Sequence, residues 1–126
     1  GAGTDLLSGG AGDDEFVADV STASDFDIID NFVVADDSIS GSNAATYEAI
    51  TDDGTIAAAG DLAAAVAAAY VLATAGNDAG LEAVSFTYSG DTFVAIETAA
   101  TGDEAAALVL QLDAIEGTLT AADFIA

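Results

Sequence analysis

Apolar and polar residues alternate between residues 82 and 97, and this pattern predicts a β-hairpin. The segment EAVSFTYSGDTFVAIE places Val84, Phe86 and Tyr88 on one face of a first strand. The polar triplet Ser89–Asp91 supplies the residues of a tight turn, after which the alternation resumes. Two antiparallel strands are therefore expected here.

A helix is expected before this hairpin. Asp61 follows Gly60 and is a favourable N-cap residue, and the pattern extends to Gly76, which is a typical end signal. The apolar positions at helical spacing are Leu62, Val66, Tyr70 and Val71.

A third strand is expected within AALVLQLDA, which begins at Ala106. Its residues are apolar on both faces, which is typical of a strand that lies inside a sheet.

The first 17 residues repeat a nine-residue pattern of glycine, aspartate and a large apolar residue. Residues 9–17, GGAGDDEFV, match the pattern G-G-x-G-x-D-x-U-x at every fixed position, where U is a large apolar residue. Residues 1–8 match it from the second glycine onward. Each x-U-x triplet predicts a three-residue strand with Leu7 or Phe16 pointing inward, and the glycines permit tight turns with positive φ.

The turns of this pattern are candidate calcium sites. Glycine brings backbone carbonyls close to an ion and aspartate adds a carboxylate, so every available ligand is an oxygen, and flexible loops of this kind suit calcium better than magnesium. The expected ligands are Gly1, Gly3, Asp5, Gly10, Gly12 and Asp14. The alternative is a Gly/Asp-rich surface loop that joins two strands.

Successive turns of such a coil lie on opposite edges, so Asp5 and Asp14 are expected on different edges. Each turn then forms half of a site. The other half has to come from outside the first 17 residues, either from a longer repeat array or from a neighbouring copy of the chain.

The charge of the chain supports bound cations. Its 126 residues include 23 Asp and Glu but no Lys, Arg or His, which gives a formal net charge of −23, while 52% of the residues are apolar. Side-chain salt bridges are therefore impossible, and salt or divalent metal has to reduce the repulsion. Nucleic acid and direct docking on anionic membranes are excluded, because both need basic residues. The apolar run at 62–76 is too short to span a bilayer, and we expect no N-terminal signal peptide.

The segment STASDFDIIDNFVVADDSISGS, which begins at Ser21, resembles the region that follows the last repeats in secreted RTX proteins, including the serralysin metalloproteases. This resemblance implies that Ile28, Ile29 and Ile39 close the apolar interior. The candidate ligands that it implies are Asp27, Asp30, Asp36 and Asp37. Asn31 departs from the pattern, because it is inserted between Asp30 and the following Phe. The alternative is two short strands with solvated aspartates at their flanks.

The ending EGTLTAADFIA is similar to the termini of exported RTX proteins, where an acidic residue precedes a few large apolar ones. The resemblance implies an export signal at Asp123, Phe124, Ile125 and Ala126 that the type I export machinery reads, and hence a secreted protein, extracellular or on the cell surface. The alternative is an ordinary last strand.

Catalysis is not expected. Without His, Cys, Lys or Arg, a Ser nucleophile has no usual base and an oxyanion has no cationic partner. A serralysin-like zinc site needs His, which the chain lacks.

We therefore expect a mainly β fold with one helix, in which a short calcium-binding parallel β-roll at residues 1–43 leads into a β-rich C-terminal cap at residues 44–126, as one continuous domain. The expected function is that of a calcium-dependent extracellular structural protein that self-associates through calcium into a filament or surface layer and is exported by the type I pathway. The alternative is a non-catalytic calcium-folding and secretion tail of a larger secreted protein or enzyme.

Overall fold

The computed structural model describes residues 3–18, 22–41, 44, 46–51, 54–73, 82–97 and 108–126. Within these ranges the chain is mainly β with a single α-helix, which confirms the expected class. Gly1 and Gly76 lie outside the described residues.

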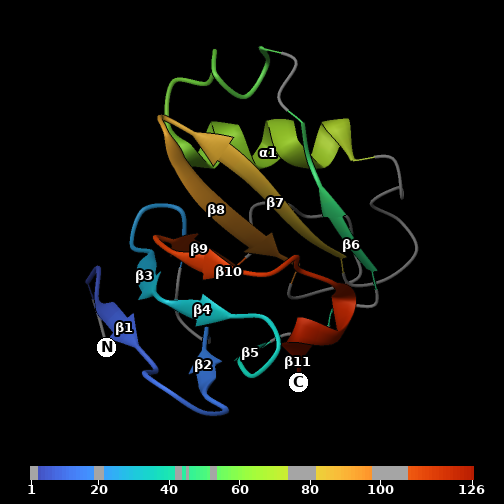
Figure 1. The fold of residues 1–126 in the computed structure, drawn as a ribbon. Helices are drawn as coiled ribbons and strands as arrows, with labels where there is room; N and C mark the ends of the chain where they lie inside the picture. The colour runs from blue at the N-terminus through green and yellow to red at the C-terminus, as the bar shows by residue number, and fades with distance from the viewer. Residues whose placement is uncertain are drawn as a thin grey trace.

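Eight short strands in the lower half of Figure 1 fall, by their parallel pairing, into three groups that we call coils. The first coil consists of β1 (Leu6–Ser8) and β2 (Glu15–Val17). The second consists of β3 (Asp27–Asp30), β4 (Phe32–Val33) and β5 (Ser38–Ser40). The third consists of β9 (Leu108–Leu112), β10 (Ile115–Glu116) and β11 (Phe124–Ile125). Corresponding strands pair in parallel, as β1–β3–β9, β4–β10 and β2–β5–β11.

The largest sheet is mixed, so parallel pairing accounts for only part of the fold. Its strand order is β1-β3-β9-β8-β7-β6, with β6 at Thr46–Ala49, β7 at Glu82–Tyr88 and β8 at Asp91–Ile96. The β7–β8 and β8–β9 pairs are antiparallel, while β6 pairs with β7 in parallel. The expected hairpin is confirmed, and both of its turn residues, Ser89 (φ 54°) and Gly90 (φ 89°), have the positive φ that a tight hairpin turn favours.

The helix α1 (Leu62–Leu72) lies across β7 and β8 in Figure 1. Asp61 caps it as expected, because its side chain accepts the N–H of Ala64 at 2.8 Å. Val71 was expected on the apolar face but is 75% exposed, so the assignment of this residue to the buried face is wrong. In the described part of the chain, no helix has both the length and the apolar character needed to cross a membrane.

The six-stranded sheet separates two apolar cores. The core inside the coils includes Phe16, Ile29, Phe32, Ile39, Leu110, Leu112 and Phe124. The core between the sheet and α1 includes Ile56, Val66, Tyr70, Val84, Phe86, Phe93 and Val109. Since successive residues of a strand point to opposite faces, β9 contributes Leu110 to one core and Val109 to the other. Its position between β3 and β8 confirms that the doubly apolar segment is an internal strand.

Asn31 forms the corner between β3 and β4. Its φ of 64° lies in the left-handed region, which Asn tolerates better than most residues. The inserted residue therefore turns the chain out of the six-stranded sheet, and the next residue, Phe32, is fully buried.

The C-terminal segment is part of the folded core. Phe124 is 1% exposed, pairs with Ile39 and stacks on Tyr47 at a ring-centroid distance of 5.7 Å. Asp123 is buried as well, and its Oδ2 accepts the backbone N–H of Thr120 at 2.6 Å. These residues form a last strand and its cap, as the alternative reading of the ending expected, whereas their role in export stays a prediction.

The buried position of Phe124 leads to a prediction about stability. Phe124→Ala is expected to lower the free energy of unfolding by about 3–5 kcal/mol, because it empties a fully buried aromatic site. Val71→Ala, at an exposed apolar residue, is expected to change it by less than about 0.5 kcal/mol. Urea unfolding followed by circular dichroism measures both, and equal midpoints for the two variants would show that β11 does not support the core.

Candidate cation-binding turns

The turn before β1 lies against the turn before β3. The Asp5 backbone N–H donates to Asp27 Oδ1 at 3.0 Å, and the Gly3 N–H donates to Asp25 Oδ2 at 3.2 Å. The Ile28 N–H in turn donates to the Asp5 carbonyl at 2.8 Å. One edge of the coils therefore holds three aspartates on two adjacent turns.

The opposite edge holds a second pair of turns. The Asp14 N–H donates to Asp37 Oδ1 at 3.1 Å, and the Ser38 N–H donates to the Asp14 carbonyl at 2.9 Å. The other oxygen of Asp37, Oδ2, accepts the Val33 N–H at 2.8 Å. Asp37 is buried and thus ties its own turn to the turn of the first coil.

One carboxylate oxygen of Asp14 receives no hydrogen bond from the described residues. This oxygen, Oδ2, is buried. Gly9 packs directly on this carboxylate, since a Cβ at Gly9 would lie 2.5 Å from Oδ2. Gly10 and Gly12, with φ of 98° and 106°, bend the chain around the same turn. A buried carboxylate oxygen without a donor is costly, and a bound cation would remove that cost.

The remaining candidate ligands are placed differently. Asp30 lies opposite Ser8, at the other end of β3 from Asp27, and Asp36 is exposed. Gly3, at the first edge, has a φ of 103°. The structure thus brings together Asp5 with Asp27 and Asp14 with Asp37, but it does not bring Asp30 or Asp36 into these contacts.

The halves of the two turn pairs come from the same chain. The sequence analysis expected the second half of each site from a longer repeat array or from another copy of the chain. In the structure, Asp25, Asp27 and Asp37 contact the first turns from positions 22 to 23 residues further along the same chain. Asp25 was missed as a candidate. The signal for it was the common spacing, since Asp25 and Asp27 stand two residues apart, as Gly3 and Asp5 do.

Acidic side chains alone do not complete a metal site. Across the described ranges, no three His, Cys, Asp or Glu side chains gather in a way that could hold a metal ion. A cation at these turns would therefore take most of its ligands from backbone carbonyls and water, a donor set that calcium accepts with its six to eight oxygens.

Two buried glutamates form a further acidic feature that sequence reasoning missed. The Glu82 N–H donates to Glu97 Oε2 at 3.1 Å, and the Glu97 N–H donates to the Glu82 carbonyl at 2.9 Å. Burial raises the pKa of Glu82, and the charges of Glu97 and Glu48 raise it further. The sequence did contain a signal for this pair. Glu82 and Glu97 stand equally far from the turn at Ser89 and Gly90, which places them opposite each other in the hairpin.

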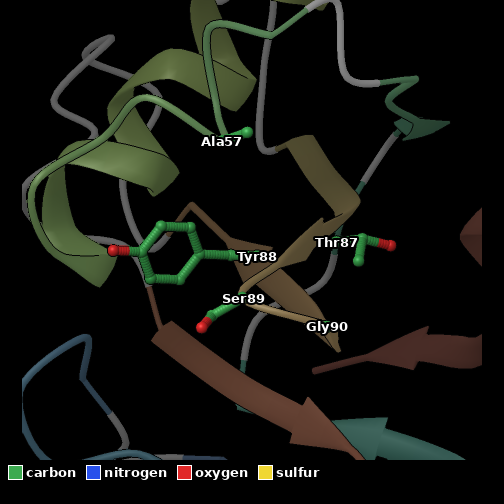
Figure 2. Close-up of a pocket in the computed structure, with 5 residues that line it drawn as sticks. All are labelled: Ala57, Thr87, Tyr88, Ser89 and Gly90. Atoms are coloured by element: carbon green, nitrogen blue, oxygen red, sulfur yellow. The ribbon is translucent and has the colours of Figure 1, made fainter.

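A hollow of about 480 Å³ lies beside the hairpin turn. Figure 2 shows its lining residues, Ala57, Thr87, Tyr88, Ser89 and Gly90. The Tyr88 hydroxyl is engaged, because it donates to the Ala59 carbonyl at 3.2 Å. The lining includes no carboxylate or basic side chain that could activate a nucleophile.

Comparison with known proteins gives no identification. No protein-family model matches the chain, and no curated protein matches it. The resemblance to RTX proteins therefore rests on the residues quoted above.

The geometry of Asp37 generates a prediction. Asp37→Ala is expected to cost about 2–4 kcal/mol of folding free energy, because it removes both acceptors of the Asp14 and Val33 N–H groups. Asp36→Ala removes the same charge from the adjacent exposed residue and is expected to change the free energy by less than about 0.5 kcal/mol. Thermal and urea unfolding compare the two. Equal effects would contradict the role of Asp37 in joining the turns.

Proposed function

We propose that this chain is a calcium-dependent extracellular structural protein, whose three coils act as a short calcium-binding parallel β-roll. The observation that carries the proposal is the buried Asp14 Oδ2, which has no hydrogen-bond partner among the described residues and lies in a glycine-lined turn. The stacked partner turns of Asp37 and of Asp27 support it.

Electrostatics favour a bound cation at both edges. Asp5, Asp25 and Asp27 lie on adjacent turns, and the chain has no basic side chain to offset their charge. A bound divalent ion reduces this repulsion, and its coordination replaces the water that the carboxylates lose on burial. Calcium fits better than magnesium, because carbonyl-rich turns supply many oxygens in flexible geometry.

The residues that would hold the ions follow from the contacts. At one edge these are Asp14 and the turn around Gly10 and Gly12, stacked on Asp37, and at the other edge Asp5 and Asp27. Bound calcium would supply countercharge there, and the chain's own backbone would set the spacing of the turns.

We further propose self-association through the open face of the first coil. Both β1 and β2 are outer strands of their sheets, and Leu6 and Val17 on them are 68% and 54% exposed. A hollow of about 430 Å³ lies between these strands. At the other end of the ladder β9 is covered by β8, so among the described strands an added coil finds open edges in both sheets only at the first coil.

This asymmetry bears on how copies would assemble. Contact between two open first-coil faces produces a closed pair, whereas growth into a filament or surface layer needs a second, different contact surface. Calcium between the turns would neutralise carboxylates that otherwise keep two strongly anionic copies apart.

The alternative function uses the same face differently. In a non-catalytic calcium-folding and secretion tail, the occupant of the open first-coil face would be a preceding coil of a larger secreted protein or enzyme. Both functions include export by the type I pathway, with the signal at residues 123–126. Burial of Phe124 in the folded core implies that such a signal would be read before the chain folds.

Calcium dependence is tested by unfolding. One bound calcium at a hundredfold excess over its Kd adds about 2.7 kcal/mol, so the melting temperature should rise when calcium replaces chelator. Asp14→Asn should remove a large part of this rise, whereas Asp13→Asn, at the exposed neighbouring residue, should keep it. A melting temperature that is the same in calcium and in chelator would refute the proposal.

Self-association is tested by sedimentation and small-angle scattering of the wild type. Calcium at millimolar concentration should produce dimers or polymers that chelator dissolves. Leu6→Glu should prevent them, while Val71→Glu, which makes the same change at an exposed residue of α1, should not. Monomers in calcium would exclude self-assembly and favour the secretion-tail alternative.

A further inference from the structure

Two glutamates face each other at the end of the hairpin that lies away from its turn. Glu82 begins β7, and Glu97 directly follows β8. We propose that Glu82 and Glu97 form a second divalent-cation site, separate from the turns of the coils.

The position of Glu82 is the first argument. The residue is 1% exposed, and neither of its carboxylate oxygens has a hydrogen-bond partner within the described ranges. Glu97 is also fully buried, and its Oε2 accepts the Glu82 N–H. Like charges placed directly opposite in an antiparallel pair destabilise the sheet, so this arrangement needs compensation.

The composition limits what can compensate it. An unpaired charge inside a protein is strongly unfavourable, and buried acids are normally matched by Lys, Arg or His. This chain has none of these residues at any position. No side chain of this protein can supply a positive charge to the pair, whereas a proton or a cation from solution can.

The chemistry of the pair selects the class of cation. Two carboxylates carry a charge of −2 when ionised, which a divalent ion balances. Carboxylate oxygens are hard ligands that suit calcium and similar ions, and water or backbone oxygens can complete the coordination. Two carboxylates with such neutral ligands are compatible with the finding that no three acidic side chains gather within the described residues.

Tyr70 provides a spectroscopic probe for this site. Its hydroxyl donates to the Glu82 carbonyl at 3.2 Å, so the ring lies next to the proposed ion. Terbium(III) can replace calcium at oxygen sites, and it emits when a nearby tyrosine is excited. Terbium bound at Glu82 and Glu97 is therefore expected to emit on tyrosine excitation, and calcium is expected to quench that emission by competition.

Four single substitutions test whether the emission comes from this site. Glu82→Gln is expected to reduce the emission at least tenfold, whereas Glu116→Gln, which removes the same charge from exposed β10, should leave it unchanged. Tyr70→Phe should reduce the emission strongly without changing the number of calcium ions bound, and Tyr88→Phe should keep it. Emission that persists in Glu82→Gln, or that is absent from the wild type, would overturn the proposal.

The test is independent of the calcium turns. Asp14→Asn should lose the calcium bound at its own turn yet retain the terbium emission, so failure of one proposal leaves the other intact. Calorimetry should show one fewer calcium ion bound by Glu82→Gln than by Glu116→Gln.

The wild type alone distinguishes a cation from a shared proton, should Glu82→Gln fail to fold. Because the pKa of Glu82 is raised above 4.5, the folded state binds this proton more tightly, and stability falls as pH rises from 4.5 through the raised value. Calcium at the pair should displace the proton and lessen this fall, with proton uptake by the buffer measurable within that pH range. If calcium neither lessens this fall in stability nor releases protons, the pair is neutralised by protons only.

Discussion

Every buried carboxylate in this protein has to be stabilised without a basic side chain. The sequence has 23 acidic residues and no Lys, Arg or His, so the possible partners are backbone N–H groups, uncharged side-chain donors such as the Thr120 hydroxyl, protons and cations from solution. Asp37 and Asp123 illustrate the first solution, since Asp37 accepts the N–H groups of Asp14 and Val33 and Asp123 accepts the N–H of Thr120. Asp14 Oδ2 and the Glu82 carboxylate receive no hydrogen bond from the described residues, and both cation proposals start from them.

The six-stranded sheet connects these acidic features mechanically. Strand β9 pairs with β3 of the second coil on one side and with β8 of the hairpin on the other. Its side chains enter both apolar cores, through Leu110 and Val109. Cations that hold the coil turns would therefore also support the sheet on which α1 packs, and a change at one end of the sheet would be felt at the other.

The acidic turns and the first coil are the basis of the structural role proposed above. The acidic turns are built from short strands and glycine corners, and Asp25, Asp27 and Asp37 accept backbone N–H groups there. The face of the first coil leaves two strand edges open, which is the usual place for further strands to add. Under the proposed function, repulsion between two anionic copies would oppose such addition until calcium neutralises the carboxylates, so calcium would control both folding and assembly.

The sequence by itself determined the local elements. The Asp61 cap, the alternation from Val84 to Phe86 and the inward Phe16 are patterns that a few neighbouring residues define, because hydrogen-bonded caps and side-chain periodicity act over one or two turns. Only the tertiary structure decided that Asp27 lies on Asp5, that residues 108–125 return to form the third coil and that Glu82 is buried. These depend on which strands pair across 22 or more residues, and that choice follows from how the two cores fill their space rather than from any local pattern.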